Sequence, residues 1–181
     1  LLCVLVPLSR MYLGVHTPAD VGVSVVVALA LVFGLYPVIR KAVDSPKTMR
    51  TLLACMVVLA AGYLAFVSLY SFPADVDVSN LSHGTKNAYT MLGCMLGVWA
   101  VYEVDSRWTR FDTEAPLPGQ ICKLALGLGL LLAIKIGAKA PLQALFTNDY
   151  LADGLRYFLM VVFAGCVWPR TFPLWKKIGK H

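Results

Sequence analysis

The run VGVSVVVALALVFGLY, from Val21 to Tyr36, contains no charged residue. With the apolar residues on either side it predicts a helix over about 19–39, and a transmembrane helix needs about 20 such residues. Gly22, Ala28 and Gly34 are small residues that let a neighbouring helix approach closely. The sequence therefore predicts a membrane-spanning helix that packs against others.

Three residues mark the start of this helix. Thr17 suits the N-cap position, Pro18 suits the first helical position, and Asp20 suits the acidic position of a capping box. We therefore expect the helix to begin directly after Thr17.

The composition of the whole chain agrees with a membrane environment. Hydrophobic residues make up 59% of the 181 residues, and charged residues make up 14%. The mean hydropathy is +0.71. A water-soluble domain of this size would have too little polar surface to cover itself. The composition therefore predicts an integral membrane protein.

Four further apolar stretches predict spans at about 51–70, 87–102, 121–138 and 151–168, and the segment 71–86 reads as a loop. Within the stretch 87–102, Gly93 and Gly97 have the small-xxx-small spacing of close helix contacts. The run 1–8 is too short to cross a bilayer, so we expect it to be the end of a helix that begins upstream of a truncated sequence. The predicted fold class is all-α, a polytopic transmembrane helical bundle with about five complete spans plus the end of a truncated one.

The distribution of Lys and Arg predicts the orientation, because basic residues favour cytoplasmic loops. With alternating spans, eleven of the 16 basic residues fall on one side and five on the other. The larger group predicts a cytoplasmic C-terminus and an extracytoplasmic position for residues 9–20. The net charge of +6 then reflects loops that face anionic lipid, and we expect no nucleic-acid partner. The larger group is Arg40, Lys41, Lys47, Arg50, Arg107, Arg110, Lys123, Arg170, Lys176, Lys177 and Lys180; the smaller is Arg10, Lys86, Lys135, Lys139 and Arg156.

The segment from Ser9 to Asp20 brings arginine, histidine and carboxylate into one short polar loop between apolar runs. The guanidinium of Arg10 can hold two phosphate oxygens, and the start of the following helix offers unsatisfied N–H groups. His16 is placed to attack phosphorus if Asp20 fixes the tautomer of its ring. A histidine beside a helix start is, taken alone, more often a capping or surface residue.

The pattern Ser9-Arg10-x5-His16-x3-Asp20 resembles the third motif of the type-2 phosphatidic acid phosphatase family. The resemblance implies that His16 is the nucleophile and Asp20 its partner, so both are catalytic. It also implies that Arg10 binds phosphate, with Ser9 as a further contact. Bacterial members with extra C-terminal spans carry glycine-rich and Glu-x-x-x-Arg segments similar to the one at Glu103.

Two other motifs of that family, Lys-x6-Arg-Pro and Pro-Ser-Gly-His, are missing from the sequence. Both precede the third motif in the family, so the chain as given is expected to be truncated and catalytically incomplete. The resemblance divides the chain into residues 1–40, the C-terminal part of a phosphatase core, and residues 41–181, additional C-terminal transmembrane helices. The five Cys have neither metal-ligand nor disulfide spacing, so we expect no metal site and no cofactor.

These features predict a hydrolase of lipid metabolism in the membrane, most simply a bacterial plasma membrane. It would hydrolyse a lipid phosphate or diphosphate, such as a polyprenyl diphosphate, through a phosphohistidine intermediate at the extracytoplasmic face. The expected partners are the lipid bilayer and the lipid phosphate substrate. The alternative is a non-catalytic membrane protein, a transporter or an accessory subunit, that retains the motif as a remnant.

Overall fold

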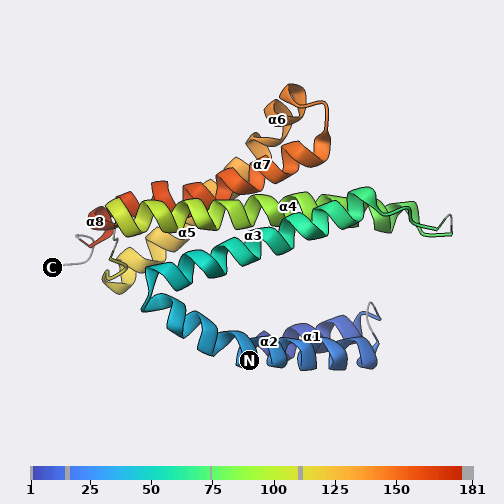
Figure 1. Ribbon diagram of the computed structural model, residues 1–181. Coiled ribbons are helices and arrows are strands. Elements are labelled where there is room, and N and C mark those ends of the chain that lie inside the picture. The colour runs from blue at the N-terminus through green and yellow to red at the C-terminus, as the bar shows by residue number, and fades with distance from the viewer. Residues whose placement is uncertain (1, 15–16, 74, 110–111, 177–181) are drawn as a thin grey trace. The chain divides into compact units, whose positions relative to one another are not determined.

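The computed structural model describes residues 2–14, 17–73, 75–109 and 112–176, and each regular element in these ranges is a helix (Figure 1). This confirms the predicted all-α class. The α-helices are α1 (Leu2–Tyr12), α2 (Pro18–Val43), α3 (Pro46–Leu69), α4 (Val78–Val104), α5 (Leu117–Gly137), α6 (Lys139–Leu145), α7 (Asp149–Val162) and α8 (Phe172–Trp175). Three short helices of other types continue α4 and α7: η1 (Asp105–Thr109), η2 (Phe163–Val167) and η3 (Trp168–Thr171).

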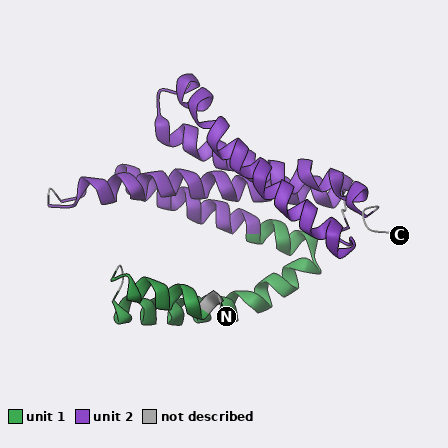
Figure 2. Cartoon of the chain, turned by 180° about the vertical axis from the view of Figure 1, so that it is seen from behind, with its two compact units in different colours: residues 1–52 green, residues 53–181 purple. Residues whose placement is uncertain are grey.

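The chain divides into two compact units, which Figure 2 colours separately. Unit 1 is Leu1–Leu52 and contains α1, α2 and the first residues of α3. Unit 2 is Leu53–His181 and contains the remaining helices. Each unit is described by itself below.

Among the described residues, four helical segments are long and apolar enough to cross a membrane: Pro18–Val43, Pro46–Leu69, Leu117–Leu145 and Asp149–Trp175. They correspond to the predicted spans at 19–39, 51–70, 121–138 and 151–168. Their side chains are largely uncovered by protein; Val26 in α2, for example, is 66% exposed and Phe33 is 76% exposed. Such continuous apolar surface is stable in lipid and not in water, so the protein is an integral membrane protein.

The remaining predicted span, 87–102, lies inside α4, which is not among those four segments. The first third of α4 is polar, which explains why this helix is not among them. The structure also corrects the predicted loop over 71–86, because α4 begins at Val78. The side chain of Asp77 caps this helix by accepting a hydrogen bond of 2.8 Å from the backbone N–H of Ser79.

Helices α4 and α7 run parallel and pack along their length (Figure 1). Gly93 meets Gly154, Gly97 meets Val161, and Val101 meets Gly165, so the residue numbers of the two helices rise together. A Cβ atom on Gly93 would lie 2.1 Å from the carbonyl oxygen of Gly154, a distance that no real contact permits. The predicted close contact at Gly93 and Gly97 is therefore confirmed.

Helix α5 runs antiparallel to α7 in the same unit. Near its start, Gly119 approaches Trp175, and further along Gly127 approaches the indole of Trp168. At the other end, the guanidinium of Arg156 donates to the carbonyl oxygen of Lys135 over 3.5 Å. Unit 2 is thus organised around α4, α5 and α7.

Unit 2 also encloses a pair of opposite charges. The side chains of Asp153 and Arg156 are 8% and 7% exposed and form an ion pair of 2.5 Å. Lys86 of α4 adds a second cation, with its ammonium 3.2 Å from the Asp153 carboxylate. These charges link α4 to α7, because Lys86 of α4 and Arg156 of α7 both pair with the Asp153 carboxylate. Nε of Arg156 is buried without a hydrogen-bond partner.

Candidate active site

Ser9 and Arg10 lie in the last turns of α1, whereas the sequence had placed them in a loop. The helix continues to Tyr12 because the backbone N–H of Leu13 still bonds to the carbonyl of Ser9, over 3.0 Å. The helix then stops at Gly14, whose φ of +66° is the left-handed conformation that ends many helices. Arg10 therefore sits on a helix whose end is fixed.

Asp20 lies in the first turn of α2, where the predicted capping box is confirmed. Its carboxylate Oδ2 accepts a hydrogen bond of 2.9 Å from the backbone N–H of Thr17. In return, its backbone N–H donates to the Thr17 hydroxyl over 3.2 Å. Because both bonds involve Asp20, the start of α2 fixes the position of this carboxylate.

Arg10 and Asp20 line the same pocket between α1 and α2, which has a volume of about 340 Å³. Ser24, one turn after Asp20, contributes a hydroxyl, and its Oγ donates to the backbone carbonyl of Asp20 over 2.8 Å. The guanidinium of Arg10 makes no hydrogen bond or ion pair with any residue that the structure describes. The rest of the lining is apolar: Val6, Pro7, Val21, Val25 and Ala28.

The other two predicted site residues are not placed in this pocket. Ser9 is not part of the lining, and its hydroxyl donates to the carbonyl oxygen of Val6 over 2.8 Å. A contact from Ser9 to phosphate would require that hydroxyl to rotate. His16 lies outside the described residues. In the sequence it directly precedes the N-cap Thr17.

Ser24 is the lining residue that sequence reasoning did not single out. The signal was its spacing, because residues four apart lie on the same face of a helix, and Ser24 follows Asp20 by four.

The pocket between α1 and α2 thus combines the cation of Arg10, the carboxylate of Asp20 and the hydroxyl of Ser24. Across the described ranges, no three His, Cys, Asp or Glu side chains gather in a way that could hold a metal ion.

The long apolar helices define the class as a polytopic helical membrane protein, and the pocket of Arg10 and Asp20 lies between α1 and the first of these long helices, α2. Residues 89–178 match the family described as PAP2 superfamily phosphatase, transmembrane extension, and the chain carries this domain over those residues. The predicted resemblance is therefore confirmed at the level of the superfamily. No curated protein and no solved structure matches the chain.

The family match and the motif lie in different parts of the sequence. The match begins at Tyr89 within α4 and continues through α8 in unit 2. It includes Glu103 and Arg107, whose side chains form an ion pair of 2.8 Å. The motif from Ser9 to Asp20 lies in unit 1, outside the matched residues. The two parts indicate the same superfamily independently.

Proposed function

We propose that this protein is a lipid phosphate or diphosphate phosphatase that works through a phosphohistidine intermediate. The observation that supports this most directly is the shared pocket of Arg10 and Asp20 at the start of α2. These two residues are ten positions apart in the sequence, line one pocket, and are two of the residues in the motif pattern. The transmembrane extension in residues 89–178 supports the same superfamily from another part of the chain.

In this proposal Arg10 holds the phosphate by two oxygens, since its guanidinium is a planar donor that stays charged. A ring nitrogen of His16 attacks phosphorus, and the bond from phosphorus to the leaving oxygen breaks. The Asp20 carboxylate accepts a hydrogen bond from the N–H of the other ring nitrogen, which fixes the tautomer, and stabilises the imidazolium cation that forms. Water then attacks the phosphohistidine, which releases inorganic phosphate and restores the imidazole.

The leaving oxygen must gain a proton, and the phosphate carries more charge than one guanidinium offsets. Arg10 is the only cation in the described lining of the pocket. The general acid and the further phosphate ligands therefore come from outside this lining.

The substrate class follows from the site and its surroundings. The pocket lining is mostly apolar beyond its three polar side chains, which suits a phosphate carried on a hydrocarbon. We propose that the pocket opens at the extracytoplasmic face and that polyprenyl diphosphates or phospholipid monophosphates reach it there. In line with this, residues 1–40 would complete the phosphatase core, and residues 41–181 would be additional C-terminal helices.

The activity is tested by measuring phosphate release from polyprenyl diphosphate and from phosphatidic acid by the full-length protein in detergent. His16→Ala is expected to abolish release, by a factor of about 10⁴ or more, because it removes the nucleophile. His83→Ala is the matched control, since His83 is exposed in the first turns of α4. Release that survives His16→Ala would contradict the proposal.

A transporter or accessory subunit is the second candidate, and the buried pair Asp153–Arg156 is the observation that favours it. Ionisable residues inside a membrane span often mark a transport pathway. In this chain they neutralise each other, which is why we rank the phosphatase first. A full-length protein that is folded but releases no phosphate from either substrate would favour this second candidate.

The orientation is tested with single cysteines in a cysteine-free background. Asn80→Cys lies near the start of α4 and is expected to react from outside with an impermeant maleimide. Glu114→Cys, in the segment before α5, is expected to be protected until the membrane is opened. The reverse pattern would contradict the proposed extracytoplasmic site.

A further inference from the structure

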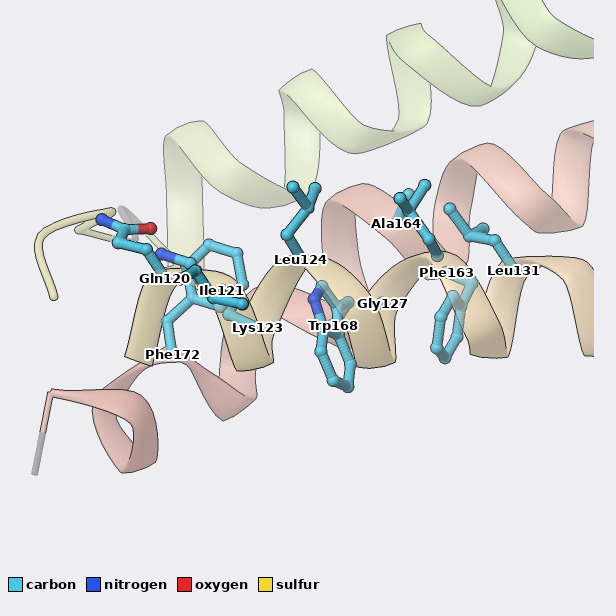
Figure 3. A pocket seen from close by; sticks show the side chains of 11 residues that line it. Gln120, Ile121, Lys123, Leu124, Gly127, Leu131, Phe163, Ala164, Trp168 and Phe172 are labelled. Carbon is cyan, nitrogen blue, oxygen red and sulfur yellow. The ribbon is translucent and has the colours of Figure 1, made fainter. Parts of the chain in front are cut away.

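A groove in unit 2 runs along α5 on the side that faces η2, η3 and α8 (Figure 3). It has a volume of about 410 Å³ and is far from any residue of the phosphatase motif in the sequence. Its lining on α5 extends from Gln120 to Leu131, which is about 16 Å along a helix. This length holds most of an extended acyl chain.

The body of the groove is apolar and open on one side. Phe163 and Trp168 form one wall, with their rings 6.3 Å apart, and Ala164 lies between them along the chain. Leu124 and Leu128 on the rim are 64% and 53% exposed. Because α5 belongs to a candidate membrane span, this opening faces hydrocarbon.

One end of the groove carries the ammonium group of Lys123, which forms no ion pair with a carboxylate in the described residues. Lys123 is 9% exposed, and its ammonium donates to the carbonyl oxygen of Thr113 over 2.9 Å. The same ammonium lies 4.4 Å from the centroid of the Phe172 ring. Both groups are neutral, and no described carboxylate lies within ion-pair distance of Lys123. The Asp112 carboxylate, which pairs with Lys176, interacts with the Lys123 charge only at longer range.

A buried cation without a counter-ion costs free energy, which a bound anion offsets. Thr113 uses one of the three N–H donors of the ammonium, so a phosphate oxygen has donors available. Thr113 also lies in the segment before α5, outside the span, where lipid phosphates are found. The end of the groove is therefore placed for a headgroup and the body for a chain.

We propose that this groove binds one anionic phospholipid, with an acyl chain along α5 and its phosphate at Lys123. The site is separate from the Arg10 pocket, so its occupancy does not depend on the proposed phosphatase activity. The bound lipid completes the packing between α5 and the segment from η2 to α8.

The proposal is tested by native mass spectrometry of the full-length protein after exchange into an equimolar mixture of phosphatidylglycerol and phosphatidylcholine. We expect one retained lipid, with phosphatidylglycerol favoured about fivefold or more because of the charge-assisted bond to Lys123. Lys123→Met should bring the ratio close to one, while Lys123→Arg should preserve it. Lys135→Met is the matched control, since it removes an exposed lysine at the other end of α5.

The position of the chain is tested separately. Ala164→Phe fills the groove from its exposed side and should reduce retention of both lipids, whereas Ala125→Phe, on α5 outside the groove, should not. A phospholipid with a diazirine on its acyl chain should label residues 120–131 and 163–168. Equal retention of the two lipids by the parent protein, a preference that survives Lys123→Met, or a lipid-free dimer that closes the groove would overturn the proposal.

Discussion

Unit 1 and unit 2 each bring one arginine and one aspartate together, but in different surroundings. Arg10 and Asp20 are exposed side chains on either side of a pocket, and the Asp20 carboxylate is held by the backbone of Thr17. Arg156 and Asp153 are buried and bind each other directly over 2.5 Å. The same two residue types therefore serve an open site in one unit and a closed contact in the other.

The two units also differ in how tightly protein covers their helices. In α2 only Ala42 is buried by protein, whereas α4 and α7 meet at glycines with no room for a Cβ atom. The Asp153–Arg156 pair is largely satisfied inside a tight contact, and among the described buried side-chain polar atoms only Nε of Arg156 is left without a hydrogen-bond partner. We infer that unit 2 is a scaffold and that the chemistry belongs to unit 1.

The largest expected effect is on the buried pair of unit 2. Asp153→Asn leaves Arg156 and Lys86 near each other without a carboxylate, and should destabilise unit 2 by about 3–5 kcal/mol. Asp149→Asn, exposed in the first turn of the same helix, should cost less than about 1 kcal/mol. Both are measured by thermal unfolding in detergent. Equal effects of the two substitutions would contradict a closed contact.

The next effect concerns the approach of α4 to α7. Gly93→Ala places a Cβ atom against the Gly154 carbonyl and should cost about 3 kcal/mol, because backbone must move. A Cβ atom on Gly129 in α5 meets nothing within 4 Å, so Gly129→Ala should be neutral or slightly stabilising. The midpoint of thermal unfolding distinguishes the two. An unchanged midpoint for Gly93→Ala would show that the helices do not pack this closely.

A smaller effect is expected in unit 1, at the cap that holds Asp20. Thr17→Ala removes the acceptor for the Asp20 backbone N–H and should destabilise the first turn of α2 by about 1 kcal/mol. Hydrogen exchange of residues 18–21 measures this. Thr51→Ala is the control, because the exposed Thr51 hydroxyl bonds only to its own helix, at Lys47. Unchanged exchange in Thr17→Ala would mean that the cap does not hold the carboxylate.

The smallest effect is on an exposed ion pair of unit 2. The hydrogen bond from Lys176 lowers the pKa of Asp112 below its ordinary value, and the backbone N–H of Glu114 lowers it further. A depressed carboxyl pKa stabilises the folded state above the unfolded-state pKa and loses this contribution as the pH falls through the folded-state pKa. Hydrogen-exchange protection of residues 172–176 should therefore fall slightly as the pH is lowered through the acidic range.

Asp112→Asn should remove that pH dependence without unfolding the unit, because both partners are exposed. Identical pH profiles for the parent and Asp112→Asn would contradict the assignment. The loss of stability caused by Asp112→Asn should stay well below the loss caused by Asp153→Asn. This contrast separates exposed from buried charge within unit 2.

Much of this architecture is predictable because its causes are local. Apolar runs of span length predict α2, α3, α5 and the span that begins with α7, and the box of Thr17 and Asp20 predicts the start of α2. The close approach at Gly93 follows from the spacing of small residues. The start of α4 was missed because its polar first turns read as a loop, although Asp77 is a good N-cap residue.

The contacts that depend on distant residues were not predictable. Lys86 reaches Asp153 across 67 positions of sequence, and nothing local to either residue indicates the other. The Lys123 ammonium lies over the ring of Phe172, which is 49 positions away and approaches it only when α8 packs on α5. In the candidate site, the spacing predicted that Arg10 and Asp20 belong together, but not that Ser9 bonds within its own helix.

The most direct test of the central claim, that unit 1 carries the chemistry, is to map the covalent intermediate. The full-length protein is mixed with a ³²P-labelled lipid phosphate, quenched in alkali, in which phosphohistidine survives, and digested for peptide sequencing. We predict label on His16, its absence in His16→Ala, and its presence in His83→Ala. Turnover with no labelled histidine, or label on any residue of unit 2, would contradict the account.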